Sequence, residues 1–168
     1  FLLGADESLA GGIADTARLF EQETISYWRK WSQRLHLPLE WQDAVIRAAI
    51  TLKLSLFEDT GAIVAAMTTS IPEAPGSQRN WDYRYCWLRD AFFVIRALNS
   101  LSEVGTMEDY LRWLSNAVVQ AKGGHIQPLF GIGLERELPE SMMEHLGGYR
   151  GMGPVRVGNQ AQEHFQHD

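Results

Sequence analysis

The 168-residue chain has little of several features that mark common protein classes. Its single cysteine, Cys86, excludes an internal disulfide and any metal site built from several cysteines. It has no apolar run of about 18 residues, as a membrane-spanning helix needs. A basic stripe is also missing, since the formal net charge is −6. We therefore expect neither nucleic acid nor a membrane among its partners. One free cysteine slightly favours the cytoplasm without requiring it.

Both ends of the sequence lack the features of natural termini. The chain begins with Phe1 rather than Met, and acidic Asp6 and Glu7 follow the short apolar run Phe1–Leu3, which does not fit a secretory signal. The last residues, Phe165–Asp168, carry no helix-capping signal. We expect the chain to be a piece of a longer protein.

Apolar residues at spacings of three and four predict four helices. These helices cover residues 13–35, 40–57, 88–104 and 106–121. The first should end before Pro38, the second should pack on two sides, and the fourth should start with Thr106 as its N-cap. The third is apolar almost all round, which is typical of a buried helix. Strands do not alternate with helices, so the predicted class is all-α, with extended segments such as Ile63–Thr69 in loops.

A long glycine-rich connection follows the fourth helix. Residues 123–158 hold nine of the chain's fifteen glycines, together with three prolines. Aromatic residues and an alternating apolar pattern favour a folded rather than a disordered segment. A fifth helix is predicted to begin within Asn159–Asp168.

The densest group of chemically useful side chains lies in Asn80–Asp90. It contains two Trp, two Tyr, two Arg and two Asp, and Arg89 and Asp90 stand at the start of an apolar helix. Aromatic faces stack on the C–H faces of sugars, while guanidinium and carboxylate groups bind neighbouring hydroxyls in pairs. The same residues could instead fill a core and form a buried ion pair. The residue pattern leaves both interpretations open.

Other candidate sites have weaker support. Gly147–Asn159 combines five glycines with two arginines and could approach a polar ligand, or could simply fold on its own glycines; it lacks the Gly-Lys-Ser/Thr of a phosphate loop. His164 and His167 have helical spacing, but such a pair usually faces solvent, so we predict no metal site and no cofactor. The loop glutamates between 135 and 144 are interpreted as solvated, and Cys86 as a buried small residue.

Three ordered stretches of the chain strongly resemble glycoside hydrolase family 15, the glucoamylase-like family. They are Arg47–Leu54 with its continuation Thr60–Ala66 and Thr68–Glu73, then Arg79–Ala91, and finally Gly148–Gly151 with Pro154–Asn159. Together they span residues 42–168.

The resemblance implies a fold and a domain order. The catalytic domain of this family is an (α/α)6 barrel, of which residues 39–168 would be the first, incomplete part. Arg89–Val104 would be an inner helix and Glu40–Phe57 an outer one. Residues 13–38 would be a linker helix, and residues 1–12 the tail of an upstream β-sandwich domain.

The resemblance also implies a sugar pocket. Six positions would bind substrate: Tyr83, Trp87, Arg89, Asp90, Tyr149 and Arg156. Arg89 and Asp90 would bind the outer hydroxyls of the terminal glucose, Trp87 would form a wall, and Tyr83 would lie near the anomeric centre. Tyr149 and Arg156 would line the next part of the cleft, although Met152-Gly153 departs from the family's usual Ser-Arg.

The implied activity is hydrolysis with inversion at the anomeric carbon. The parent enzyme would cleave α-glucosidic bonds from the non-reducing end of an α-glucan or maltooligosaccharide and release β-glucose. A trehalase acting on trehalose and a non-catalytic carbohydrate-binding protein are the alternatives. The family's general acid lies in a Trp-Glu pair, which this chain lacks. Both catalytic glutamates are therefore expected after Asp168, and the isolated fragment is expected to be inactive.

Overall fold

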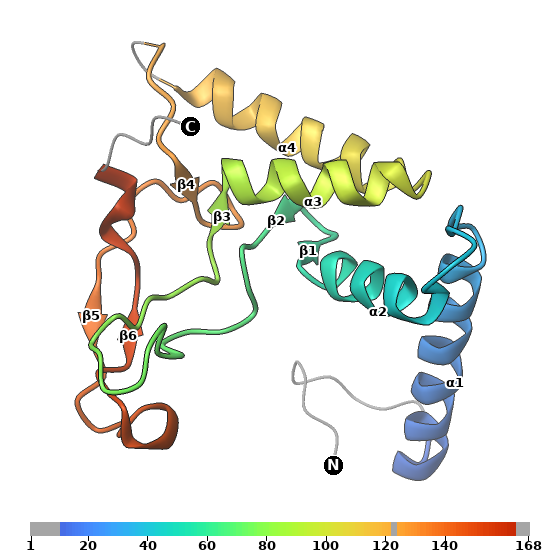
Figure 1. Cartoon of the computed structure of the whole chain (residues 1–168), viewed down its shortest axis with the longest axis horizontal. Coiled ribbons are helices and arrows are strands. Elements are labelled where there is room, and N and C mark those ends of the chain that lie inside the picture. Colours follow the sequence, from blue (N-terminus) through green and yellow to red (C-terminus); the bar gives the residue numbers. More distant parts are fainter. Residues whose placement is uncertain (1–10, 122–123, 164–168) are drawn as a thin grey trace.

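The computed structural model describes residues 11–121 and 124–163, in which helices predominate (Figure 1). The four α-helices are α1 (Ile13–Ser32), α2 (Gln42–Lys53), α3 (Leu88–Ser100) and α4 (Gly105–Gln120). Six two-residue strands are β1 (Leu56–Phe57), β2 (Ala62–Ile63), β3 (Cys86–Trp87), β4 (Leu129–Phe130), β5 (Ser141–Met142) and β6 (Arg156–Val157). They form three antiparallel pairs, β1–β2, β3–β4 and β5–β6. Two short 3-10 helices are η2 (Tyr149–Gly151) and η3 (Gln160–Glu163). The all-α class is confirmed.

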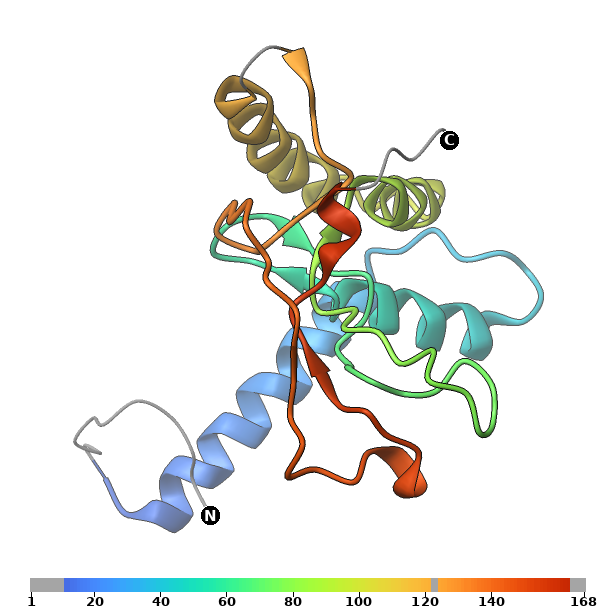
Figure 2. The same cartoon turned by 90° about the vertical axis from the view of Figure 1, so that its left-hand side faces the viewer.

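The helices and the loop region occupy different parts of the structure. Helices α3 and α4 run side by side, α2 packs on α3, and α1 stands at one end of this group (Figures 1 and 2). The segments between β2 and β3 and between β4 and η3 extend away from the helices (Figure 1). The second of these segments contains the β5–β6 pair. The glycine-rich connection is therefore folded where the structure describes it, as predicted.

The main core lies where the small strand pairs meet α4. Trp113 stacks on Tyr110, with ring centroids 5.6 Å apart, and meets Phe130 edge to face at 5.9 Å. Its indole N–H donates to the Ile132 carbonyl at 3.1 Å, which satisfies the polar atom of a buried ring. Cys86 is fully buried in the same cluster, and burial raises the pKa of its thiol to about 12. Its predicted role as a buried small residue is confirmed.

Several predicted helix boundaries need correction. Helix α2 ends at Lys53 rather than at Phe57, because Leu56 and Phe57 pair with β2 across a turn. Thr106 does not cap α4: it is fully buried, and the Glu103 carboxylate accepts from its backbone N–H at 3.2 Å. The predicted fifth helix begins as the 3-10 helix η3, and residues 164–168 lie outside the described part.

The prediction that the third helix is buried is wrong. Only Ala91 and Leu98 of α3 are buried, while Phe92 and Phe93 are 53% and 57% exposed. Their rings contact each other edge to face at 5.4 Å. Helices α2 and α4 cover only part of the α3 surface within the described chain. Leu88, Val94 and Ile95 pack against the core, whereas Phe92 and Phe93 face outward.

Of the two predicted segments before the barrel, residues 1–12 and 13–38, only the second is described in full. Residues 1–10, most of the predicted β-sandwich tail, lie outside the described residues. Helix α1 corresponds to the predicted linker helix and buries none of its residues. Among the described helices, none has the length and apolar character needed to cross a bilayer.

A hydrogen-bonded trio ties α1 to the end of α2. The Tyr27 hydroxyl donates to a Glu58 oxygen at 2.7 Å, and the Lys53 ammonium lies 3.2 Å from the same carboxylate. Lys53 is buried, and its Nζ also lies 3.5 Å from the Thr106 hydroxyl. The Tyr27 bond, followed by Lys53, lowers the pKa of Glu58 below its ordinary value of 4.5.

This trio predicts a small loss of stability in acid. Because the folded-state pKa of Glu58 lies below the unfolded value, its contribution is present above pH 4.5 and is lost as the pH falls through the folded value. The effect should be about 0.5 kcal/mol, since the carboxylate is 59% exposed and screened by water. Urea unfolding at about pH 6 and pH 3 should show a smaller acid loss for Glu58→Gln than for the unaltered chain. Equal losses would contradict the prediction.

Candidate functional site

The aromatic segment, Asn80–Asp90, is positioned by backbone pairing with the loop that follows β2. The Ala66 N–H donates to the Tyr83 carbonyl at 2.9 Å. Ala65 makes the same bond to Tyr85, also at 2.9 Å. The strand pair β3–β4 continues this arrangement to Trp87. Successive side chains of an extended segment alternate between two faces, so Tyr83, Tyr85 and Trp87 pack in one cluster.

Tyr83 and Trp87 form a tilted aromatic pair. Their ring centroids are 6.0 Å apart at an interplanar angle of 46°. Trp87 is buried and Tyr83 is half-buried. Burial, and then a 2.7 Å hydrogen bond to the Glu73 carboxylate, raise the pKa of Tyr83 to about 12. The phenol therefore stays protonated at neutral pH and donates a hydrogen bond to Glu73.

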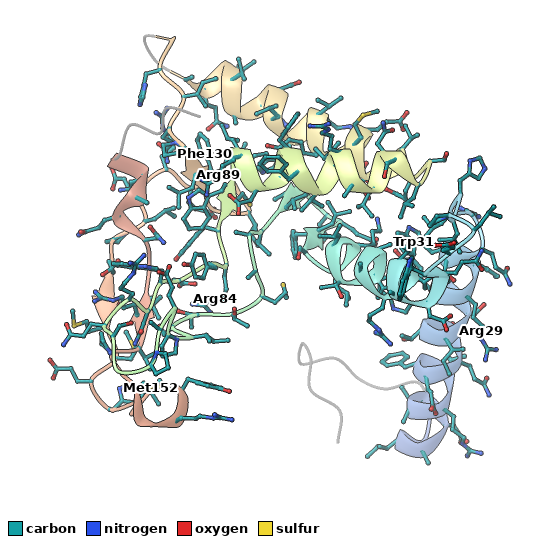
Figure 3. The ribbon with its side chains drawn as sticks, in the orientation of Figure 1. Arg29, Trp31, Arg84, Arg89, Phe130 and Met152 are labelled. Atoms are coloured by element: carbon teal, nitrogen blue, oxygen red, sulfur yellow. The ribbon has the colours of Figure 1, made fainter. Side chains whose placement is uncertain are left out.

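Arg89 and Asp90 lie at the first turn of α3, directly after Trp87. Their side chains are 46% and 36% exposed, and the Arg89 Nη2 lies 3.2 Å from an Asp90 oxygen. Figure 3 shows Arg89 at the β3 end of the helix. A carboxylate in this position is favoured by the helix dipole. Both groups are accessible enough to bind hydroxyls, and the negative charge of Asp90 also contributes to the raised pKa of Tyr83, after burial and Glu73.

A second Arg–Asp pair in the segment, Asp82–Arg84, has a structural role. Asp82 is fully buried, and its carboxylate accepts two hydrogen bonds at 2.9 Å from the Arg84 guanidinium. It also accepts from the Gly158 N–H at 3.2 Å, and its backbone carbonyl accepts from the Asn159 side chain at 3.0 Å. Asp82 thus joins the aromatic segment to the glycine-rich loop. The two interpretations left open by the sequence apply to different pairs: in Asp82–Arg84 the carboxylate is fully buried, whereas in Arg89–Asp90 both side chains are accessible.

Arg156 is held in place by three kinds of contact. Its guanidinium binds Glu140 and lies over the Trp81 ring, with Cζ 5.2 Å from the ring centroid. Its backbone N–H donates to the Ser70 hydroxyl at 2.7 Å. The side chain is only 12% exposed, and its buried Nε–H has no partner within the described residues.

Tyr149 lies apart from the other predicted site residues. It opens η2, is half exposed, and has the Arg150 guanidinium 5.4 Å from its ring centroid. The loop that contains it also contains Met152, which Figure 3 places at the opposite end of the loop region from Arg89. The Asn80 side chain fixes this loop by donating to the Met152 carbonyl at 2.9 Å.

The structure therefore brings together four of the six predicted residues. Tyr83, Trp87, Arg89 and Asp90 lie along one continuous segment. Arg156 lies on the part of the glycine-rich loop that Asp82 joins to this segment, and Tyr149 lies on the same loop but apart from the other residues. The sequence reasoning missed Glu73 as the partner of Tyr83 and Asp82 as the link to the loop. Both residues stand in the quoted family-like stretches, but their partners are set by folding and cannot be read from the spacing.

The weaker candidates have structural roles or lie outside the described part. Glu140 pairs with Arg156, and Glu135 accepts from the Gly133 N–H at 3.0 Å. No group of three or more potential metal ligands gathers within residues 11–121 and 124–163. His164 and His167 are not among these residues.

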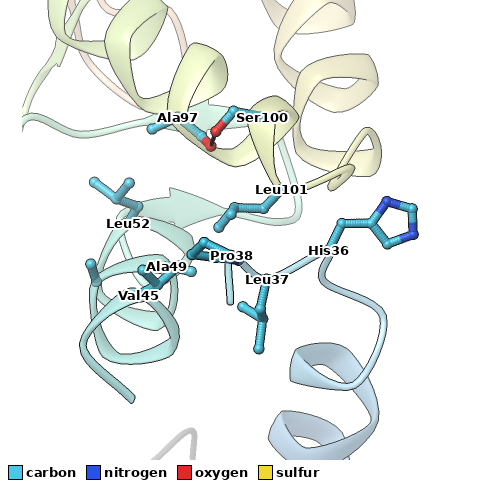
Figure 4. A pocket seen from close by; sticks show the side chains of 10 residues that line it. His36, Leu37, Pro38, Val45, Ala49, Leu52, Ala97, Ser100 and Leu101 are labelled. Carbon is cyan, nitrogen blue, oxygen red and sulfur yellow. Dashed lines mark hydrogen bonds between the residues drawn. The ribbon is translucent and has the colours of Figure 1, made fainter. Parts of the chain in front are cut away.

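A separate pocket lies between α2, α3 and the chain that joins α1 to α2 (Figure 4). Its volume is about 570 Å³, and its walls are mostly apolar, with Pro38, Leu52 and Leu101 among them. Of its two polar side chains, His36 is hydrogen-bonded to Ser102 at 2.9 Å and Ser100 to the Ala97 carbonyl at 2.6 Å. Without a carboxylate or guanidinium in its wall, this pocket does not suit a polyhydroxylated ligand.

An accessible Arg–Asp pair beside an aromatic pair has the hydrogen-bond donors, acceptors and apolar faces that suit a polyhydroxylated ligand such as a sugar. Residues 41–168 match the model of Glycosyl hydrolases family 15, and the chain belongs to that family. The resemblance seen in the sequence is thereby confirmed.

Curated relatives of the chain are named trehalases. The chain is 40% identical over 150 residues to a trehalase of Mycolicibacterium smegmatis, covering 87% of this chain and 22% of that protein. It is 39% identical over 150 residues to a trehalase of Mycobacterium tuberculosis, with the same coverage. A trehalase of Thermoplasma volcanium is 38% identical over 147 residues, covering 88% of this chain and 23% of the relative. The chain thus spans about a quarter of the length of these relatives. No solved structure matches it.

Proposed function

We propose that the whole protein is an inverting trehalase and that this chain supplies the pocket for one glucose unit of trehalose. The observation that carries the proposal is the accessible Arg89–Asp90 pair beside Tyr83 and Trp87, in a chain whose curated relatives are named trehalases. These names favour trehalose over the α-glucan or maltooligosaccharide substrate that the sequence resemblance placed first.

We further propose that residues 39–168 form the first part of an (α/α)6 barrel, with α3 as an inner helix and α1 as a linker after a β-sandwich domain. The exposed Phe92 and Phe93 rings support this assignment, because an inner helix is covered on further sides by other barrel helices. Burying such rings stabilises a fold by roughly 1.5–3 kcal/mol each.

Each side chain in the proposed pocket has a definite role. Arg89 donates to, and Asp90 accepts from, adjacent outer hydroxyls of the glucose. Trp87 is only 5% exposed and backs the Tyr83 ring at the wall of the pocket, and the Tyr83 oxygen faces the anomeric carbon. On the neighbouring part of the cleft, Tyr149 offers a half-exposed ring, and Arg156 a largely buried guanidinium.

The catalytic acid and base lie elsewhere in the whole protein. Inversion needs one carboxylic acid at the leaving oxygen and one carboxylate that activates water, with roughly 6.5–9.5 Å between them. We assign neither role to a residue of this chain, which has no Trp-Glu pair. Glu140 is engaged with Arg156 and Glu73 with Tyr83 and Arg79, so neither is an alternative.

The substrate is tested with the whole protein. Purified enzyme should hydrolyse trehalose with a higher kcat/KM than maltose or maltotriose. Proton NMR during the reaction should show equal amounts of α- and β-glucose first, because inversion at one anomeric carbon of an α,α-linked disaccharide leaves the other unchanged. Faster hydrolysis of maltotriose would instead establish the glucan-cleaving activity, and binding without turnover would establish a carbohydrate-binding protein.

The pocket is tested by substitutions at the accessible pair. Arg89→Ala or Asp90→Asn in the whole protein should lower kcat/KM for trehalose by about 100-fold, since hydrogen bonds to charged groups contribute about 1.5–3 kcal/mol each. The control is the Arg112–Asp109 ion pair on α4, in which Asp109 is as exposed as Asp90 and Arg112 is more exposed than Arg89. Arg112→Ala and Asp109→Asn should leave turnover unchanged. Equal, small effects on kcat/KM at both pairs would show that Arg89 and Asp90 do not bind the substrate.

A further inference from the structure

Glu73 lies in a closed loop directly beside the proposed pocket. The loop begins after the Ser70–Trp81 backbone bond and is closed by the Glu73 N–H, which donates to the Arg79 carbonyl at 3.1 Å. Ser77 tightens its tip by donating from its hydroxyl to the Ala74 carbonyl at 2.9 Å. This closure fixes the backbone from which the Glu73 carboxylate reaches the aromatic segment.

Both oxygens of the Glu73 carboxylate are engaged. Oε1 accepts from the Tyr83 hydroxyl at 2.7 Å, and Oε2 lies 2.7 Å from Nη2 of Arg79. The Tyr83 bond first, and then Arg79, lower the pKa of Glu73. The carboxylate therefore stays ionised at neutral pH, and Arg79 fixes the direction in which it faces Tyr83.

The ionised carboxylate of Glu73 also determines the direction of the Tyr83 O–H bond. An anionic acceptor makes a shorter and stronger hydrogen bond than a neutral one. The Tyr83 proton consequently points at Glu73, and the lone pairs of the phenol oxygen point away from it. Partial withdrawal of the proton toward Glu73 raises the electron density on that oxygen.

We propose that Glu73 is a positioning residue that acts through Tyr83 during glycoside cleavage. It holds the Tyr83 ring at its angle to Trp87 and turns an electron-rich phenol oxygen toward the sugar. Positive charge develops at the anomeric carbon in the oxocarbenium-like transition state, so this oxygen stabilises the transition state more than the bound substrate. The inference rests on the proposed placement of the glucose beside Tyr83.

The matched control for Glu73 is the Tyr27–Glu58–Lys53 trio. There too a tyrosine hydroxyl donates to a carboxylate at 2.7 Å beside a cation, but Tyr27 lies on α1, outside the proposed pocket. If the Tyr83–Glu73 bond were purely structural, replacing Glu73 should affect kcat no more than replacing Glu58. A positioning role should appear only at Glu73.

The test measures kcat and KM separately for trehalose with the whole protein. Glu73→Gln, which keeps the size and an acceptor oxygen but removes the charge, should lower kcat about 10-fold with little change in KM. Glu58→Gln should change neither. In a Tyr83→Phe background, Glu73→Gln should have almost no further effect on kcat, because its route through the hydroxyl is gone.

The outcomes distinguish this inference from the proposed function. A loss at Arg89→Ala together with unchanged kcat at Glu73→Gln overturns the positioning role alone. The positioning role also fails if the effects of Glu73→Gln and Tyr83→Phe multiply independently. If Arg89→Ala and Glu73→Gln both leave turnover unchanged, the proposed pocket itself is wrong. Ultraviolet titration adds an independent readout, since Glu73→Gln should lower the Tyr83 pKa from about 12 toward its ordinary value.

Discussion

Replacing Gly158 by alanine is expected to lower the free energy of unfolding by about 3–5 kcal/mol. Gly158 has φ +90°, a left-handed conformation that costs other residues about 1–2 kcal/mol. An added Cβ would also meet the Pro139 carbonyl oxygen and carbon, both of them backbone atoms closer than any normal contact. Backbone cannot rotate away as a side chain can. The crossing of residues 138–140 over 158–159, with its Asn159–Leu138 hydrogen bond, would have to shift.

Gly76→Ala is the matched control, because it separates strain from crowding. Gly76 has a similar positive φ of +70°, but nothing lies within 4 Å of the position of its Cβ. Its substitution should cost only the conformational strain of about 1–2 kcal/mol. Urea unfolding followed by tryptophan fluorescence measures both variants against the unaltered chain. Equal losses for the two glycines would show that the Pro139 contact is relaxed at little cost.

The helices were the most predictable part of the fold, and their errors are informative. The starts at Ile13 and Leu88 agree with the structure, because periodic apolar spacing and local breakers determine them. The apolar pattern of α2 continues to Phe57, but the chain leaves the helix at Lys53. There the Leu56–Phe57 pairing with β2 prevailed over a periodicity that fitted a longer helix.

Burial could not be predicted from composition alone. Phe92 and Phe93 make α3 look like a fully buried helix, but each ring is more than half exposed. An apolar side chain is buried only where another element covers it, and the described part of the chain supplies α2 and α4 on only some sides. The family resemblance implies that α3 is an inner helix, a proposal that periodicity alone could not have suggested.

The site was predictable in its composition but not in its connections. The density of aromatic and charged residues indicated Asn80–Asp90 as a candidate region, and the family resemblance, not the spacing, selected Tyr83, Trp87, Arg89 and Asp90 within it. Glu73 meets Tyr83 only because a loop folds back across ten positions, and contacts such as Ser70–Arg156 join residues 86 positions apart. Such contacts depend on which segments pair in space, and local residue spacing does not encode that pairing.

Asp82→Ala is expected to lower the free energy of unfolding by about 3 kcal/mol and to abolish most trehalose turnover. The carboxylate is fully buried and accepts from the Arg84 side chain and the Gly158 backbone. Its removal takes an acceptor from the buried Gly158 N–H and from the Arg84 backbone N–H, and losing the acceptor of a buried donor costs about 1–3 kcal/mol. The Arg84 side chain is 46% exposed and can turn toward water, so losing its Asp82 partner costs it less free energy. The aromatic segment would separate from the loop of Arg156, and both border the proposed pocket.

Asp109→Ala on α4 provides the comparison, because Asp109 also pairs with an arginine but is 37% exposed. Its loss should change the free energy of unfolding by less than about 0.5 kcal/mol, as is usual for an exposed ion pair. Asp82→Asn should lie between the two alanine variants, since the amide keeps the shape and one acceptor oxygen but loses the charge opposite Arg84. Urea unfolding of the three variants and their kcat/KM for trehalose give the ranking. Equal stability of Asp82→Ala and Asp109→Ala would show that Asp82 does not anchor the segment, and the proposed pocket would then need another support for its loop.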